Sequence, residues 1–254
     1  MSSPLRRPLL AGNWKMNLTL SQSADLAKLV AGEVNLASGE VAVFVPATAI
    51  AVVSQILRGT GVRLGAQNGY WELSGAFTGE ISMTQLADAG CEMVLIGHSE
   101  RRKLFGDSDE WINKKLGAAL KAGLTPVVCV GETLDERDSQ KTWRVLETQI
   151  SAGLQGFASA DLSRVVIAYE PVWAIGTGKT ATPAQAQEAH LFIRGRLKAL
   201  HGEGLSAGCR ILYGGSVTAD NVDSLMAQPD VDGALVGGAS LKKDFLRIMG
   251  FQRP

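Results

Sequence analysis

The chain has 254 residues, enough to bury a sizeable core and within the usual length of one α/β barrel domain. Its 25 basic and 25 acidic residues balance, so no overall field favours nucleic acid or a membrane surface, and any anion recognition must be local. Cys91, Cys129 and Cys209 lie far apart and match no metal-ligand spacing, and no apolar run nears the about 18 residues of a membrane span. We therefore expect a cytoplasmic protein with no metal, no nucleic-acid partner and no membrane partner.

Eight short apolar, β-branched runs recur along the chain. They are nearly continuous in apolar character rather than alternating, which is typical of parallel strands covered by helices. We predict strands at residues 9–14, 41–46, 62–67, 93–97, 125–131, 165–169, 210–213 and 233–236.

Helical patterns separate these runs. The strongest begins at Thr182, a suitable N-cap, with Pro183 in the first helical position and Gln185 completing a capping box. A second helix is predicted at residues 21–33. The apolar face predicted for the first helix contains Ala189, Ile193, Leu197 and Leu200.

Eight strand-then-helix units without a linker favour one α/β domain over residues 1–254, a closed (β/α)₈ TIM barrel. An open doubly wound sheet is the alternative on periodicity alone. In such a barrel the active site lies at the C-terminal ends of the strands. The residues found at or just after the ends of the predicted strands include Asn13, Lys15, His98, Glu170, Ser216, Gly237 and Gly238.

Each of these residues also has an ordinary structural interpretation. A lysine near a strand end is usually a solvated charge, and paired glycines are often simple turns. Glu170 is more unusual, because it stands between apolar neighbours and must be desolvated or paired. Burial would raise the pKa of its carboxyl group toward the range of a general base. Glycine pairs at neighbouring strand ends could also present backbone N–H groups to a phosphate.

Residues 171–181 form a loop longer than the about 2 to 6 residues of most βα loops. Its small central residues, including Gly176, predict a closing lid. Two other motifs overlap it. Gly178-Lys179-Thr180 resembles the end of a P-loop, but Trp173 occupies the position of the required first glycine. A dinucleotide-binding GxGxxA match begins six residues after Glu170 instead of at the strand end, so we expect no nucleotide cofactor.

Four motifs resemble the triosephosphate isomerase family in order and spacing. They are GNWKMN at 12–17, IGHSERR at 96–102, AYEPVWAIGTGK at 168–179 and YGGSV at 213–217. The resemblance extends from residue 9 to the last helix. It implies a TIM barrel, an isomerase of glycolysis and gluconeogenesis, a triose phosphate substrate and no cofactor.

The resemblance also implies a role for each site residue. Glu170 would be the base that takes a proton from the carbon beside the carbonyl, and neutral His98 the electrophile that polarises it. Lys15 and Asn13 would bind substrate and stabilise the enediolate. The backbone N–H groups holding the phosphate would come from Gly176, Ser216, Gly237 and Gly238.

A second long loop, residues 67–80, carries Tyr70, Trp71, Leu73 and Phe77. An exposed cluster of this kind usually marks a partner surface, although an internally packed loop is the alternative. The resemblance implies that the loop docks into a second copy, with Thr78 and Phe77 at the contact, and hence a homodimer. Residues 69–73 fall in a part of the family that varies.

Two other functions remain open. A non-catalytic phosphosugar-binding barrel would keep the fold and the phosphate site, but it would need neither Glu170 nor His98. A barrel isomerase for a larger phosphosugar would act poorly on triose phosphates.

Overall fold

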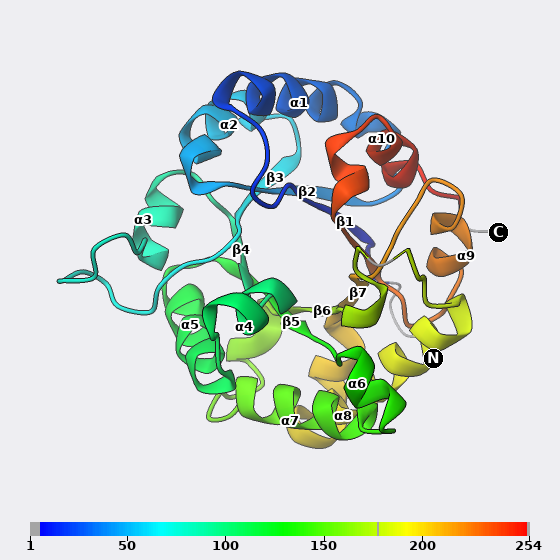
Figure 1. Ribbon diagram of the computed structural model, residues 1–254. Coiled ribbons are helices and arrows are strands. Elements are labelled where there is room, and N and C mark those ends of the chain that lie inside the picture. Colours follow the sequence, from blue (N-terminus) through cyan, green and yellow to red (C-terminus); the bar gives the residue numbers. More distant parts are fainter. Residues whose placement is uncertain (1–5, 177, 253–254) are drawn as a thin grey trace.

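A computed structural model, which describes residues 6–176 and 178–252, contains a closed barrel of eight parallel strands in the order β1 to β8 (Figure 1). β1 pairs with both β2 and β8, which closes the sheet. This architecture excludes the open doubly wound sheet. The strands are β1 Leu9–Asn13, β2 Glu40–Val45, β3 Val62–Ala66, β4 Met93–Ile96, β5 Thr125–Val130, β6 Val166–Tyr169, β7 Arg210–Tyr213 and β8 Gly233–Val236.

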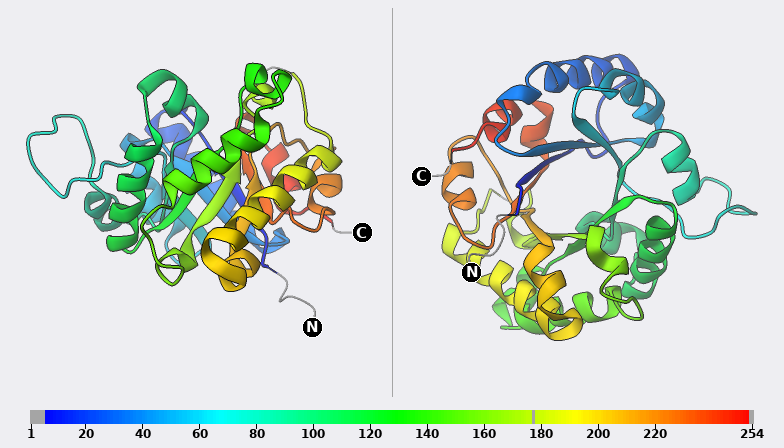
Figure 2. Two further views of the ribbon diagram at one scale, coloured as in Figure 1. Left: turned by 90° about the horizontal axis from the view of Figure 1, so that it is seen from below. Right: turned by 180° about the vertical axis from the view of Figure 1, so that it is seen from behind.

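Helices form a layer around the barrel (Figures 1 and 2). The α-helices are α1 Leu20–Gly32, α2 Ile50–Leu57, α3 Met83–Asp88, α4 Ser99–Phe105, α5 Asp109–Lys121, α6 Leu134–Asp138, α7 Thr142–Gly153, α8 Pro183–Gly208, α9 Val222–Met226 and α10 Asp244–Met249. Single 3₁₀ turns are η1 Val34–Leu36, η2 Ala47–Ala49, η3 Asp161–Arg164, η4 Val172–Ala174 and η5 Gly238–Leu241.

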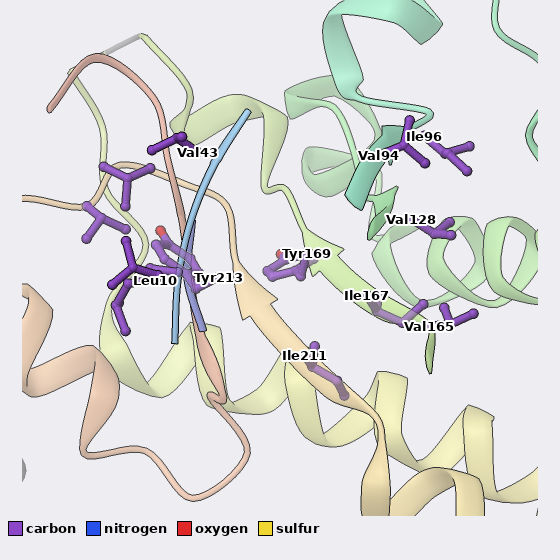
Figure 3. Close-up of a cluster of buried hydrophobic side chains, with 14 of the residues drawn as sticks. Leu10, Val43, Val94, Ile96, Val128, Val165, Ile167, Tyr169, Ile211 and Tyr213 are labelled. Carbon is purple, nitrogen blue, oxygen red and sulfur yellow. The ribbon is translucent and has the colours of Figure 1, made fainter. Parts of the chain in front are cut away.

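The continuous apolar character of the strands follows from burial on both faces of the sheet. One set of side chains fills the barrel, including Leu9, Phe44 and Leu95. The alternate set points outward and packs under the helices, and Figure 3 shows part of it, with Leu10 and Ile167 among the labelled side chains. Because both sets are apolar, polar residues are left for the strand ends.

The predicted helix signals are largely confirmed. Thr182 caps α8 through the backbone N–H of Gln185, Pro183 begins the helix, and α1 starts one residue before its predicted position. Ala189, Ile193 and Leu197 are buried, but Leu200 is 41% exposed, so its assignment to the apolar face is wrong. Leu200 lies in the last turn before Gly202, whose φ of 85° interrupts the helix.

The segment between β3 and α3, which contains residues 67–80, extends away from the barrel (Figures 1 and 2). Residues 72–80 are exposed. Within the part of the chain that the structure describes, no helix is long and apolar enough to cross a membrane.

Candidate active site

One cavity of about 570 Å³ at the C-terminal end of the strands is lined by every residue predicted to bind substrate or act on it. They reach it from five strand ends and the predicted lid, and a closed parallel barrel brings these strand ends together. Thr177, in the middle of the predicted lid, lies outside the described residues. The predicted residues lining the cavity are Asn13, Lys15, His98, Glu170, Gly176, Ser216, Gly237 and Gly238.

Glu170 and His98 meet directly at the floor of this cavity. Nε2 of His98 lies 2.9 Å from Oε1 of Glu170, and the backbone N–H of Ser99 donates to Oε2 at 2.9 Å. The carboxylate is only 2% exposed. A Cβ at Gly214 would come within 2.9 Å of Cγ of Glu170, so this position needs glycine to give the carboxylate room.

The carboxyl group of Glu170 is buried as expected, but its pKa moves in the opposite direction. Burial raises the pKa, whereas the His98 imidazole, the Ser99 N–H and the Lys15 ammonium lower it, and the net direction is downward. The expectation of a raised pKa is therefore wrong for the protein without substrate. The reason is that three donors or cations reach the carboxylate from other parts of the chain.

His98 is the N-cap of α4, and its Nδ1 accepts the backbone N–H of Glu100 at 3.3 Å. A nitrogen that accepts an N–H carries no proton, so this contact favours the neutral tautomer with hydrogen on Nε2. Burial also lowers the pKa of the imidazole, but Glu170 raises it and the net direction is upward. As long as Glu170 contacts the ring, the hydrogen bond to Nδ1 favours a neutral imidazole, whereas the charge of Glu170 favours a protonated one.

Lys15 projects from the turn after β1, where its backbone adopts a φ of 50°. Its N–H donates to Oδ1 of Asn13 at 3.0 Å, and its Nζ donates to Oε1 of Glu100 at 2.6 Å. A Cβ at Gly237 would lie 3.4 Å from Cε of Lys15, so the lysine stem runs beside the end of β8. The ammonium group therefore lies close both to Glu100, beside His98, and to the glycine-rich wall.

The opposite wall of the cavity consists of the loops after β7 and β8. Gly237 caps the 3₁₀ turn η5, and a Cβ at Gly238 would meet no atom within 4 Å. Ser216 is half-buried, and its carbonyl accepts Nδ2 of Asn221 at 3.1 Å. Backbone N–H groups at a 3₁₀ turn beside glycines suit an anion with several oxygens, such as phosphate.

The first turn of the predicted lid is anchored to Glu132, a buried carboxylate. Nε1 of Trp173 donates to Oε1 of Glu132 at 2.8 Å, and the hydroxyl of Tyr169 donates to both of its oxygens at 3.1 Å. Arg137 adds an ion pair at 3.2 Å and lies over the Trp173 ring. Beyond this anchor, Gly176 is exposed with a φ of 68°.

The projecting loop is partly packed on itself. The Tyr70 ring stacks on Trp71 at 4.0 Å and lies 4.9 Å from Phe77, and Trp71 meets Trp111 of α5 at 5.3 Å. Leu73 nonetheless remains 70% exposed and Phe77 41%. The loop is therefore partly packed on itself, as the alternative expected, and the partner surface stays a prediction.

Four residues that contact the site were missing from the predicted set. They are Ser99 and Glu100 beside His98, Glu132 after β5, and Gln67 after β3, which binds the backbone of Lys15. The signal that could have found them is the one used for the others, namely a polar residue just after an apolar run.

Comparison with known proteins agrees with this geometry. The sequence model of the triosephosphate isomerase family matches residues 8–252. Proteins named triosephosphate isomerase are 54% identical in Geotalea uraniireducens (97% of this chain, 99% of the relative) and 52% in Pelobacter propionicus (98% and 100%). Across residues 6–176 and 178–252, no group of three or more His, Cys, Asp or Glu could hold a metal ion. By sequence and by fold, this chain belongs to the triosephosphate isomerase family.

Proposed function

We propose that this isomerase, as one domain of residues 1–254, interconverts dihydroxyacetone phosphate and D-glyceraldehyde 3-phosphate through an enediolate. Family membership supports a triose phosphate substrate. A C–H beside a carbonyl is a very weak acid, so the reaction needs a base at the carbon and donors at the oxygen where charge develops. The cavity holds a carboxylate, an imidazole and an ammonium group facing one space.

Glu170 is the proposed base. In the free protein His98 and the Ser99 N–H hold its two oxygens. A substrate entering between the two side chains displaces the carboxylate from these donors. Their loss raises the pKa of Glu170 and makes it a stronger base in a cavity from which the substrate excludes water.

The same displacement keeps His98 neutral. Glu170 is the main group that raises the pKa of the imidazole, and its departure leaves burial and Lys15 to lower it. With Nδ1 held by the Glu100 N–H, the Nε2 hydrogen is free to donate to the substrate oxygens. Lys15 and Asn13 complete the donors that stabilise the enediolate.

The phosphate is held by backbone N–H groups of Gly176, Ser216, Gly237 and Gly238 in this proposal, and residues 171–181 close over it. Support comes from the contrast within the lid, where Trp173 is fixed to Glu132 and the exposed glycine beyond it has a left-handed backbone. A closed lid excludes water, which would otherwise promote loss of phosphate from the enediolate.

The single observation that carries this mechanism is the 2.9 Å contact between Glu170 and His98 within a cavity that is also lined by the glycines after β7 and β8. Coupled assays in both directions with the two triose phosphates test it, and we expect turnover in each. A protein that binds these substrates without converting them is instead a phosphosugar-binding barrel. Faster conversion of a larger phosphosugar would indicate the third alternative.

We also propose a homodimer formed through residues 67–80. A second cavity of about 460 Å³ on the same rim is lined by Lys15, His98 and Glu100 together with Met16, which is 95% exposed. Such an exposed apolar side chain beside catalytic groups fits the tip of a partner's loop, with Thr78 and Phe77 entering the cavity.

Sedimentation across a range of concentrations tests the dimer. We expect Phe77→Asp to raise the dimer dissociation constant by at least about 10-fold, because it brings a charge into an apolar contact. Leu191→Asp is the matched control, since Leu191 is 57% exposed on α8, away from the loop. A wild-type protein that stays monomeric at every concentration contradicts the proposal.

A cytoplasmic location is proposed from cysteine usage. Cys91, Cys129 and Cys209 are all free and buried. Burial raises the pKa of the Cys91 and Cys209 thiols to about 12, so both stay protonated and unreactive. Three buried thiols suit a reducing compartment.

A further inference from the structure

The backbone of Lys15 is held on both sides by side-chain amides. Its N–H donates to Asn13, and its carbonyl accepts Nε2 of Gln67 at 2.9 Å. The same Nε2 also donates to the carbonyl of Phe44 at 3.1 Å, at the end of β2. Gln67 therefore ties the turn that carries Lys15 to the rim of the sheet.

This turn has a conformation that lysine does not adopt by preference. Lys15 has a φ of 50°, where an L-residue is strained because its Cβ approaches the following carbonyl. Such a backbone persists only where surrounding groups hold it, and it is found preferentially at functional sites. With its backbone held, the Lys15 side chain can run past Gly237 into the cavity and reach Glu100.

We infer that Gln67 is a positioning residue that holds Lys15 in this strained conformation, so that the ammonium group faces the developing enediolate. The inference rests on the role of Lys15 proposed above. Gln67 acts through Lys15, since its amide nitrogen is engaged by two backbone carbonyls. Without that amide, the turn relaxes to a negative φ and carries the ammonium group away from the substrate oxygen.

The opposing explanation is that Gln67 only stabilises the end of the barrel. Gln67 also begins the loop at 67–80, so its loss could act through the dimer. The structural and the dimer explanations both predict that Gln67→Met lowers ligand affinity and kcat by the same factor whichever residue occupies position 15. The positioning role predicts that the loss disappears once the ammonium group is absent.

A double-mutant cycle separates these explanations. Gln67→Met keeps the length of the side chain and removes the amide, and Lys15→Met removes the ammonium group. The probe is 2-phosphoglycolate, whose carboxylate mimics the charge of the enediolate, and its dissociation constant is measured by calorimetry without any need for turnover. All proteins are compared at concentrations where sedimentation shows the same oligomeric state.

We expect Gln67→Met to raise this dissociation constant about 10-fold when Lys15 is present and less than about 2-fold when it is methionine. In the Lys15 background kcat should fall about 10- to 10²-fold, below the roughly 10²- to 10³-fold typical of deleting a transition-state donor. Asn113→Leu is the matched control. Its amide also donates to backbone carbonyls, those of Ala152, Gly153 and Gln155, so it should lower thermal stability and leave kcat and KM unchanged.

Equal losses in the two backgrounds would overturn the inference and leave Gln67 a structural residue. A loss that disappears when the variant is concentrated into the wild-type oligomeric state would overturn it in favour of the dimer. If Lys15→Met itself changes neither binding nor turnover, the proposed role of Lys15 fails, and the positioning role fails with it.

Discussion

The barrel carries a cluster of charged residues around a buried carboxylate at each end, Asp232 at one and Glu170 at the other, and the two clusters are built differently. At the N-terminal end, Arg194 donates to Asp230 and Asp232 at 2.6 Å and to the carbonyls of Ser206 and Cys209. Asp232 also accepts Nε of Arg6 at 2.6 Å and the N–H of Ile211 at 2.9 Å. Every charge there has several fixed partners, and the cluster is closed.

At the C-terminal end, the charged groups border an open cavity. Glu170 is held by one imidazole and one backbone N–H, both of which a substrate can replace, and Lys15 depends on a strained turn. The contrast teaches that a buried charge stabilises a fold when its partners are permanent and is available for chemistry when they are exchangeable. Changes at the two ends should therefore affect different measurements.

The largest expected effect is on turnover at the open end. Glu170→Gln removes the proposed base while it keeps the shape of the side chain, and we expect kcat to fall by about 10²- to 10⁴-fold. Affinity for inorganic phosphate, measured by calorimetry, should change little, because the proposed phosphate donors lie on the opposite wall. A variant with near-normal turnover removes Glu170 from its assigned role.

Substitutions in the closed cluster at the N-terminal end should lower the stability of the fold. Arg194→Met leaves Asp230 and Asp232 short of a buried partner, and we expect the free energy of unfolding to fall by about 3–5 kcal/mol in denaturant titrations. Lys28→Met is the control, because Lys28 and Asp25 form an exposed pair 4.0 Å apart that should contribute almost nothing. If kcat of the folded Arg194 variant fell as much as that of Glu170→Gln, the contrast between the ends would be lost.

Much of the site could be predicted because its signals are local. Asn13 lies at the end of an apolar run, and His98 and Glu170 each follow one. Parallel strands in a closed barrel bring their C-terminal ends together. The residues therefore converge although 72 positions separate His98 from Glu170, a spacing that carries no information by itself.

Other features depend on groups that no local pattern connects. The pKa of Glu170 is set by His98, Ser99 and Lys15 as well as by burial, so its net direction could not be predicted from its apolar neighbours. The packing of Trp71 on Trp111 joins two elements 40 positions apart, and only the fold brings them together.

The two ends also differ in how they respond to acid. His190 is buried beside the closed cluster, with Nδ1 3.1 Å from the carbonyl of Asp230, and burial lowers its pKa from 6.5 to about 4. Between those pH values the unfolded chain binds more protons at this position than the folded chain, so stability falls as the pH falls. His98 has the opposite sign, because its pKa is raised and its contribution is lost as the pH rises.

We expect acidification from about pH 6.5 to about pH 4 to cost about 3 kcal/mol of unfolding free energy through His190. The glutamine of His190→Gln cannot titrate. Denaturant titrations of this variant should therefore show a loss of unfolding free energy between these pH values that is smaller by about that amount. An unchanged slope in His190→Gln would assign the acid sensitivity to other groups, the carboxylates of the closed cluster among them.

The smallest effect is expected on the exposed face of α8, where a substituted side chain meets no neighbour and only intrinsic propensity acts. Gly195 lies inside α8, and a Cβ there would meet no atom within 4 Å, so Gly195→Ala should raise the unfolding free energy by about 0.5–1 kcal/mol. Gly202→Ala in the same element should have the opposite sign, because a φ of 85° strains alanine. Thermal denaturation of the two variants measures these changes, and we expect kcat to be unchanged in both. Their small effects are the reference for the stability loss expected of Arg194→Met and the turnover loss expected of Glu170→Gln. A change in kcat from either substitution would mean that a structural change in α8 reaches the cavity. The two ends of the barrel would then be less independent than their separate hydrogen bonds indicate.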